Sequence, residues 1–507
     1  MQSTPPPTWL WRPYLIVFLS SACIMVLELV AARILAPFVG VSLYTWTSII
    51  GVVLAGISLG NYLGGRLADR RASLRLLGSI FLLAGLLSLS ALTVEWADRT
   101  LPGLPLVGQI LMLTLALFFL PCLALGMISP LVAKLAVTDL AQTGATVGKL
   151  YAAGTAGSIA GTFLTGFVLI SWLGTHTIIW GVAAILIFLG GLFIAGGRPR
   201  AAALLLIGLI GGSLAAGQLG WLQGPCLRET NYFCIKVHDR EMEDHTVRVL
   251  VLDRLVHSYS SLDDPTRLVY GYEQIYADLT AYRAQEDAHL SALFIGGGGY
   301  TFPRYMEAVY PGSELDVIEI DPGVTQVAYD LLGLQRDTTI RSFNEDARQF
   351  LARAPQTRYD LILGDAFNDF SVPYHLTTHE FNQQMKAWLA PDGFYMINMI
   401  DNARGDFLRA TIHTLRQSFA HVYVTPAIAG WQQSVRSTFV LIAGDHPLDQ
   451  ARLRGAQAET LLARRLLSPA EVDELLAGGR VALLTDRYAP VDQMLAPAFR
   501  ELAPPTD

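Results

Sequence analysis

The chain has 507 residues, of which 52% are hydrophobic and 16% charged, with a formal net charge of −7. This length predicts two or three domains, and the composition is too apolar for an ordinary soluble protein. The negative charge and the lack of any block rich in lysine and arginine give no indication of a nucleic-acid partner.

The apolar excess lies in the first 222 residues, where seven runs reach the roughly 20 residues that a bilayer-spanning helix needs. The first run is too long and too polar at its ends for a signal peptide, and no small-residue cleavage site follows it. We therefore expect residues 1–222 to form a multi-span helical membrane domain in the cell (inner) membrane. The expected spans are Tyr14–Leu35, Tyr44–Leu63, Leu76–Val94, Leu106–Val132, Gly148–Leu169, Thr177–Ile194 and Ala201–Leu222.

Positive charges gather in alternate loops of this domain, around Arg66–Arg75, Lys134–Lys149 and Arg198–Arg200. The positive-inside rule places these loops and the N-terminus in the cytoplasm, so an odd number of spans places the C-terminal domain on the opposite face. That placement conflicts with a co-substrate made in the cytoplasm, and one span more or fewer reverses it. The side of the soluble domain therefore stays open at this stage.

Two features inside the spans, a pair of charged residues and a row of glycines, have either a structural or a functional role. Glu28 lies in the first span with Arg33 nearby, and intramembrane charges are costly enough to be functional candidates. We favour the structural interpretation, in which an ion pair or a snorkelling arginine fixes helix packing. Gly154, Gly157 and Gly161 have helical spacing and predict a close contact between helices.

Cys226 and Cys234 follow the last apolar run and lack the spacing and companions of a zinc site. They form either a disulfide or two free thiols, and the compartment decides between these alternatives. The next region, residues 223–285, is expected to be a small β subdomain with a linker helix. Its expected elements are the strands Tyr232–His238, Thr246–Leu252 and Val256–Tyr259 and the helix Tyr270–Ala284.

From residue 286 to residue 507 strands alternate with helices, which predicts a parallel sheet covered by helices on both faces. The expected strands are Ala292–Ile295, Leu315–Ile320, Tyr359–Leu363 and Gly393–Met399, and the expected helices are Pro303–Val309, Val324–Leu331 and Glu380–Leu389. The fold class is thus an α/β Rossmann-like domain that follows the membrane helices. In such domains ligands bind at the carboxyl ends of the strands.

The most informative pattern is an ordered set of glycines and acids at those strand ends. Gly296–Gly299 follow one apolar strand, and Glu319 follows the next about 20 residues later, the spacing of a nucleoside-binding turn and a ribose-binding acid. Asp346 and Asp365 complete the set. The pattern predicts a nucleoside pocket.

This part of the chain resembles the spermidine synthase family of aminopropyltransferases, and in particular its membrane-fused branch. The resemblance rests on Leu252-Asp253, Ile295–Gly299, Val317–Asp321, Asp346, Asp365-Ala366-Phe367, Pro373–Thr378 and Asp486–Asp492.

The resemblance implies a role for each acid and for the glycine loop. Glu319 would hold the ribose hydroxyls, Asp346 the adenine amino group, and Gly296, Gly297 and Gly298 the sugar and sulfonium region. Asp365 would be the catalytic acid group that receives the attacking amine, since a carboxylate in reach can orient a neutral amine and take its proton.

The sequence departs from the family pattern on the amine side. Gly299-Tyr300 stands where the family has Asp-Gly, Asn368 with the adjacent Asp369 stands where it has a second Asp, and Gly271-Tyr272-Glu273 replaces Tyr-His-Glu. His257 replaces a glutamine of the cofactor-binding set. The candidate substrate contacts are therefore Tyr272, Tyr300, Asn368, Asp369 and Tyr374.

The leading hypothesis is a membrane-bound enzyme that transfers an aminopropyl or related group to an amine or polyamine and releases 5′-methylthioadenosine. Its co-substrate would be decarboxylated S-adenosylmethionine or S-adenosylmethionine itself, no metal is expected, and homo-oligomerisation stays open. One alternative is a lyase or cyclising enzyme that releases methylthioadenosine without an acceptor. Another is a transporter or sensor with a non-catalytic nucleoside-binding domain, because the Arg66–Arg70 loop resembles that of major-facilitator transporters.

Overall fold

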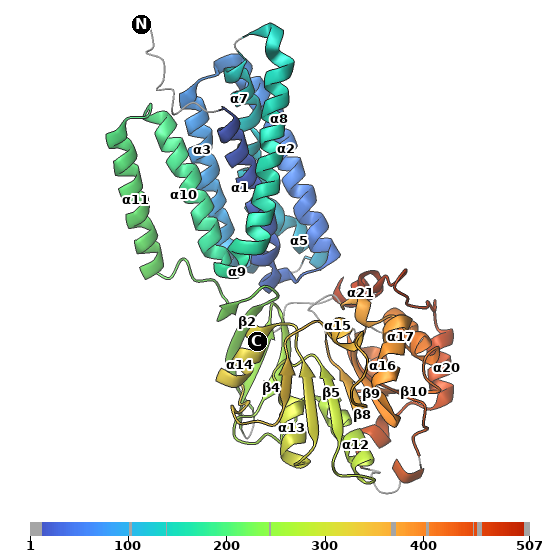
Figure 1. The fold of residues 1–507 in the computed structure, drawn as a ribbon. Coiled ribbons are helices and arrows are strands. Elements are labelled where there is room, and N and C mark those ends of the chain that lie inside the picture. Colours follow the sequence, from blue (N-terminus) through green and yellow to red (C-terminus); the bar gives the residue numbers. More distant parts are fainter. Residues whose placement is uncertain are drawn as a thin grey trace. The chain divides into compact units, whose positions relative to one another are not determined.

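The computed structural model describes residues 13–100, 104–137, 139–242, 245–366, 372–401, 405–434, 436–449, 451–453 and 459–500. The chain divides into two compact units, Met1–Cys234 and Ile235–Asp507 (Figure 1). The further division of the second part at residue 285 stays a prediction.

The first unit is helical. Among the described residues, seven helical stretches are long and apolar enough to cross a membrane by length and composition, which confirms the expected number. The third, fourth and fifth stretches each join several consecutive segments. The helices are α1 (Pro13–Val39), α2 (Leu43–Arg71), α3 (Leu74–Ser88), α4 (Val94–Arg99), α5 (Leu106–Thr114), α6 (Leu120–Gly126), α7 (Ile128–Ala136), α8 (Thr143–Leu164), α9 (Ile170–Trp172), α10 (Thr175–Ile194) and α11 (Pro199–Gln218).

The glycines of α8 bring this helix against α1, as their spacing predicts. A Cβ atom at Gly157 would lie 2.1 Å from the carbonyl oxygen of Phe18, and one at Gly161 would lie 2.6 Å from that of Ala22. Only glycine leaves room for two backbones at this distance.

Arg33 is held at the end of the first unit and not by Glu28. Its guanidinium donates hydrogen bonds to the carbonyl oxygens of Thr230 and, at 2.7 Å, of Tyr232. The same segment contains a disulfide between Cys226 and Cys234, one of the two alternatives left open by the sequence. Arg33 therefore has a structural partner in the segment that follows the last helix of this unit.

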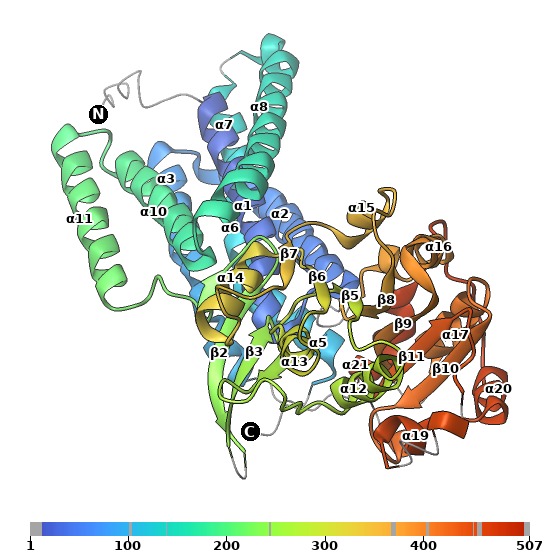
Figure 2. The same cartoon turned by 60° about the horizontal axis from the view of Figure 1, so that its bottom comes forward.

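The second unit begins with an antiparallel sheet of β2 (Cys234–Glu241), β3 (Thr246–Leu252) and β4 (Leu255–Ser260), followed by α12 (Gly271–Ala284). A seven-stranded sheet follows in the order β10-β11-β9-β8-β5-β6-β7 (Figure 2). Its strands are β5 (Ser291–Ile295), β6 (Glu314–Ile318), β7 (Arg341–Phe343), β8 (Tyr359–Gly364), β9 (Leu389–Asp401), β10 (His421–Pro426) and β11 (Ser437–Gly444). The remaining helices are α13 (Thr301–Val309), α14 (Pro322–Leu331), α15 (Ala347–Leu351), α16 (His379–Trp388), α17 (Asp406–Arg416), α19 (Leu461–Arg465), α20 (Pro469–Ala477) and α21 (Val491–Arg500).

The expectation of a parallel sheet is correct for five strands and wrong for two. β7, β6, β5, β8 and β9 are parallel, whereas β11 pairs antiparallel with both β9 and β10. The chain between β10 and β11 is short, and its described residues contain one helical segment, the 3-10 helix Trp431–Gln433. A parallel pair needs a long crossover connection. The α/β fold class is confirmed, as a mixed sheet.

Backbone hydrogen bonds continue past the parallel strands and fix the residues at their carboxyl ends. The amide of Gly296 donates to Ile318 (2.8 Å) and the amide of Asp365 donates to Ile295 (2.9 Å). The amide of Glu319 donates to Phe343 (3.0 Å). Gly296, Glu319 and Asp365 therefore lie along one edge of the sheet, where such folds bind ligands.

Candidate functional site

A cavity of about 510 Å³ lies at the carboxyl ends of β5 and β8 and is called here the acidic cavity. It brings together the glycine loop, the first turns of α12 and α13 and the start of β4. The residues that line it are His257, Ser258, Tyr272, Glu273, Tyr276, Phe294, Gly296, Gly297, Gly298, Gly299, Thr301, Phe302, Pro303, Leu363 and Asp365.

The glycine loop needs its glycines for geometric reasons. Gly296 and Gly298 have φ angles of +95° and +49°, in the left-handed region that L side chains rarely adopt. A Cβ atom at Gly296 would also lie 2.4 Å from the carbonyl oxygen of Asp365. Loop and acid are therefore in direct contact.

Glu319 holds the same loop from the side of β6. One carboxylate oxygen accepts hydrogen bonds from the amides of Gly297 (2.8 Å) and Gly298 (3.2 Å), and the other accepts one from Asp321 (2.9 Å). Burial raises the pKa of Glu319 and these backbone bonds oppose that effect. A carboxylate offers about four lone-pair sites, so Glu319 keeps capacity for one more donor, although it does not line the acidic cavity.

Asp365 directly follows β8 and lines the acidic cavity. The side-chain amide of Asn398 donates to it at 2.8 Å, and the hydroxyl of Tyr272 is a second hydrogen-bond partner. Burial raises the pKa of Asp365, while these two hydrogen bonds lower it. Two neighbouring side chains thus orient the carboxyl group of Asp365, and its pKa is higher than that of an exposed aspartate.

Glu273 is a second acid in this wall, and it was not among the site residues expected from the sequence. Glu273 is only 3% exposed. Its pKa is raised to about 8, mainly by burial and to a smaller extent by the negative charge of Asp365. Two sequence signals were available. Glu273 stands in Gly271-Tyr272-Glu273, where the resembled family has Tyr-His-Glu, and it lies on α12 between Tyr272 and Tyr276, whose spacing indicates a buried helix face. The other expected groups in the wall are Tyr272, which is buried, and His257, whose pKa burial lowers to about 4.

Besides Glu319, three expected residues lie away from the acidic cavity. Tyr300 is fully buried, and its hydroxyl donates to Ser342 at 3.0 Å, so the structure gives it a packing position. Asp346 caps α15 by accepting from Gln349, and lies 3.2 Å from the ring of His375. Tyr374 is 56% exposed. Asn368 and Asp369 lie outside the described residues.

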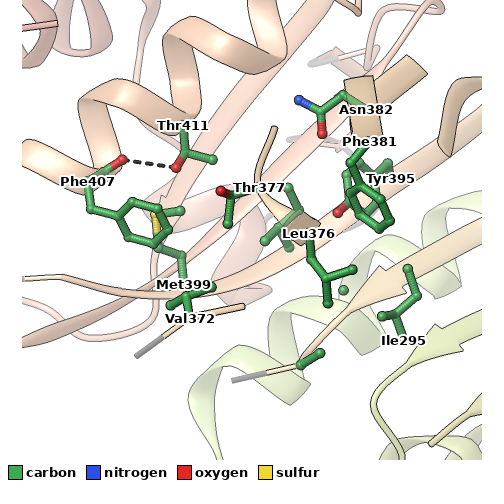
Figure 3. Close-up of a pocket in the computed structure, with 13 residues that line it drawn as sticks. Ile295, Val372, Leu376, Thr377, Phe381, Asn382, Tyr395, Met399, Phe407 and Thr411 are labelled. Atoms are coloured by element: carbon green, nitrogen blue, oxygen red, sulfur yellow. Dashed lines mark hydrogen bonds between the residues drawn. The ribbon is translucent and has the colours of Figure 1, made fainter. Parts of the chain in front are cut away.

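A second cavity of about 480 Å³ lies on the other side of β8 and is called here the apolar cavity (Figure 3). The hydroxyl of Thr411 in its wall donates to the carbonyl of Phe407 at 2.9 Å, as the dashed line shows. The residues that line it are Ile295, Gly364, Ala366, Val372, Leu376, Thr377, Phe381, Asn382, Tyr395, Ile397, Met399, Phe407 and Thr411.

In comparisons with known proteins, the chain is similar to aminopropyltransferases and to methyltransferases. No family model matches the chain. The chain is 37% identical over 114 residues to a polyamine aminopropyltransferase of Vibrio vulnificus, covering 22% of this chain and 38% of that protein. It is 29% identical over 148 residues to a probable polyamine aminopropyl transferase of Bifidobacterium longum, covering 29% of this chain and 32% of that protein.

A solved structure, described as a probable spermidine synthase from Corynebacterium glutamicum, matches with 19% identity and a TM-score of 0.43. The match covers 50% of this chain and 93% of that one. The aligned segments span about a third of the two curated relatives' lengths. The sequence matches confirm the resemblance of the C-terminal half of the chain to the spermidine synthase family.

Proposed function

Because the C-terminal half of the chain is similar to polyamine aminopropyltransferases, we propose that the protein is an enzyme of this reaction type. It transfers an aminopropyl or related group from a sulfonium nucleoside, decarboxylated S-adenosylmethionine or S-adenosylmethionine, to an amine or polyamine. The observation that carries the proposal is an oriented acid, Asp365, in one cavity with the glycine loop. The apolar helices of the first unit hold the enzyme in a membrane.

The reaction needs one proton acceptor at the reacting nitrogen. The lone pair of a neutral amine forms a bond to the carbon beside the sulfonium, the C–S bond breaks, and its electron pair makes the sulfur a neutral thioether in methylthioadenosine. The new ammonium gives its proton to the carboxylate of Asp365. The raised pKa of Asp365 brings its basicity closer to what a general base needs near neutral pH.

Orientation supplies most of the remaining acceleration, because a sulfonium leaving group needs little acid assistance. Asn398 and Tyr272 fix the carboxyl group of Asp365 through the hydrogen bonds described above. Glu319 and the glycine loop are the proposed ribose and sulfonium contacts, and Asp346 the proposed adenine contact. The contact between Gly296 and Asp365 supports a sulfonium and an amine meeting at this edge.

A product assay tests the proposal directly. The full chain, purified in detergent, is incubated with each of the two donors, with and without 1,4-diaminobutane or spermidine, and products are identified by mass spectrometry. We expect methylthioadenosine together with an aminopropylated amine. Methylthioadenosine without acceptor would favour the lyase alternative, and no methylthioadenosine in any combination would contradict the proposal.

A further inference from the structure

The contacts between helices of the first unit fix the direction in which each helix runs. α8 is parallel to α1, because Gly157 meets Phe18 and, one turn later in both helices, Gly161 meets Ala22. By the same comparison α2 and α6 are parallel, while α10 is antiparallel to both α3 and α11. The paired positions are Gly56 with Phe119, Gly64 with Met127, Gly78 with Gly190, Gly85 with Ala183, Trp180 with Ser213, and Gly191 with Leu205. These directions are the ones that seven alternating spans require.

The segment that follows α11 is bound at the end of the unit where α1 ends and α10 begins. Arg33, in the last two turns of α1, donates to the carbonyl oxygen of Tyr232 at 2.7 Å. The carboxylate of Glu229 accepts from the amide (2.9 Å) and the hydroxyl (3.1 Å) of Thr175, the first residue of α10. Residues 226–234 therefore lie at one end of the helix bundle.

Positive charge gathers at the opposite end of the bundle. There Lys134 of α7 pairs with Asp69 of α2 at 3.1 Å. The lysines and arginines in or near the loops at this end are Arg66, Arg70, Arg71, Arg75, Lys134, Lys149, Arg198 and Arg200. The connections at the other end and the segment after α11 contribute Arg99 and Arg228. Because positive residues of short loops stay in the cytoplasm, the end that carries residues 226–234 faces away from it.

The disulfide between Cys226 and Cys234 is an independent sign of the same side. Disulfides form and persist in oxidising compartments outside the cytoplasm and are rare within it. Forming this bond removes two electrons and two protons from two thiols, and the protein disulfide oxidants of the extracytoplasmic compartment accept them. Charge and redox chemistry therefore agree.

We propose that the second unit lies on the extracytoplasmic side of the membrane and carries out its reaction there. Ile235, its first residue, follows Cys234 directly, and the seven candidate spans among the described residues all precede it. This inference rests on the membrane location and the donor class of the proposed function. A sulfonium is a fixed cation, and a charge in the bilayer centre is costly. A donor made in the cytoplasm must therefore reach the site by a transport step across the membrane.

Thiol labelling in cells tests the side directly. The matched variants Ala470→Cys, on α20 of the second unit, and Ala141→Cys, between α7 and α8, place a cysteine at exposed alanines. Cells are treated with a membrane-impermeant maleimide before and after lysis. The wild type gives the background, because its free thiols, Cys23 and Cys122, are buried. We expect position 470 to be labelled in intact cells and position 141 only after lysis. Any other pattern overturns the inference.

A count of free thiols tests the disulfide in the same cells. Cells are quenched in acid, the protein is denatured, and free thiols are coupled to a polyethylene glycol maleimide. The chain has four cysteines, so we expect two labels without reductant and four after reduction. The double variant Cys226→Ser with Cys234→Ser should carry two in both cases. Four labels on the wild type without reductant would contradict an extracytoplasmic position.

Neither measurement depends on turnover, so the side is decided even if the product assay fails. Where the purified chain is active, intact cells supplied with external decarboxylated S-adenosylmethionine and 1,4-diaminobutane should release methylthioadenosine into the medium. Cells that express Asp365→Asn give the background. An active purified enzyme whose cells form no product from the external donor would place the site in the cytoplasm and overturn the inference, leaving the proposed function intact.

Discussion

The two cavities of the second unit share the end of β8, where successive residues face opposite sides of the sheet. Leu363 and Asp365 line the acidic cavity, and Gly364 and Ala366 line the apolar one. The cavities have similar volumes, about 510 and 480 Å³. Size therefore does not distinguish a site from a packing space here, and the difference lies in what each wall can do chemically.

The acidic cavity has features that are unfavourable for stability alone. It holds acids with raised pKa values, a hydroxyl without a partner among the described residues, and glycines at positive φ. The apolar cavity is walled by side chains that pack, such as Phe381 and Phe407, each 1% exposed, and by hydroxyls such as that of Thr411 that bond to their own helix. Features that cost stability are concentrated at functional sites, so the two cavities should respond to substitution in opposite ways.

The largest expected effect is on turnover, at the acidic cavity. Asp365→Asn keeps the shape and the contact with Asn398 but cannot take a proton. We expect methylthioadenosine formation to fall by ~10²–10⁴-fold, the usual contribution of a general base, while methylthioadenosine affinity in calorimetry changes little.

Thr411→Val is the matched control from the apolar cavity. It replaces a buried hydroxyl with a methyl group of similar size. Turnover should stay within about twofold of wild type, because the hydroxyl of Thr411 donates to the carbonyl of Phe407 in its own helix. Full activity in Asp365→Asn would contradict the catalytic assignment. Nucleoside binding without turnover, equal in the wild type and in Asp365→Asn, would favour the sensor alternative.

The next effect is on stability, at the apolar cavity. Phe381→Ala enlarges an existing hollow beside α16, and a buried phenylalanine truncated to alanine costs about 3–5 kcal/mol. The free energy of unfolding of the second unit, followed by tryptophan fluorescence in denaturant, should fall by that amount. At low temperature the remaining folded protein should bind methylthioadenosine with unchanged affinity. A selective loss of nucleoside binding with unchanged stability would show that the apolar cavity belongs to the ligand site.

Sequence reasoning predicted features that depend on local order and missed those that depend on distant packing. Gly296–Gly299 and Asp365 follow directly from strands with clear apolar patterns, so they could be placed at one edge of the sheet before the structure was known. Glu273 could not be found in this way, because its burial depends on the tertiary packing of α12, which contacts β11 and α19. Tyr300 seemed a cavity residue by its place after the glycines, but at φ +55° its side chain enters the core.

Sheet direction shows the same limit. The alternation of strands and helices up to β9 indicates parallel pairing correctly, because each connection contains a helix. The residues of β10 and β11 give no indication that these two strands are antiparallel. That direction follows from the short connection between them and from the free edge of β9, which β11 occupies.

A smaller effect tests the contact between the glycine loop and β4. Gly299→Ala would place a methyl group 2.0 Å from the oxygen of Ser258, and overpacking of this kind costs about 1–3 kcal/mol. We expect a corresponding loss of nucleoside affinity, up to about 100-fold. The double variant Ser258→Gly with Gly299→Ala removes the clashing side chain and should recover part of the loss, giving a coupling energy in a double-mutant cycle. Strictly additive losses would contradict the close contact.

The last expected effect is a pH dependence of stability, to which only the acidic one of the two cavities should contribute. The pKa of Glu273 is about 8 in the folded chain against an ordinary value of 4.5, so between these values the folded state holds a proton that the unfolded state has lost. Stability from this group is therefore fully present below pH 4.5 and is lost as the pH rises through 8. Asp365, whose pKa is also raised, contributes with the same sign. The other titratable groups facing Glu273 are His257, Tyr270, Tyr272 and Tyr276, which stay neutral between pH 5 and 8.

Thermal unfolding of ligand-free protein, measured from pH 5 to 8.5, should show Tm falling by several degrees, since 1 kcal/mol shifts Tm by about 2–4 °C in a domain of this size. Glu273→Gln should flatten most of this slope, while Phe381→Ala should lower Tm equally at every pH. A slope that survives in Glu273→Gln would mean that the buried acid of α12 is not the titrating group, and the chemical contrast between the two cavities would then rest on Asp365 alone.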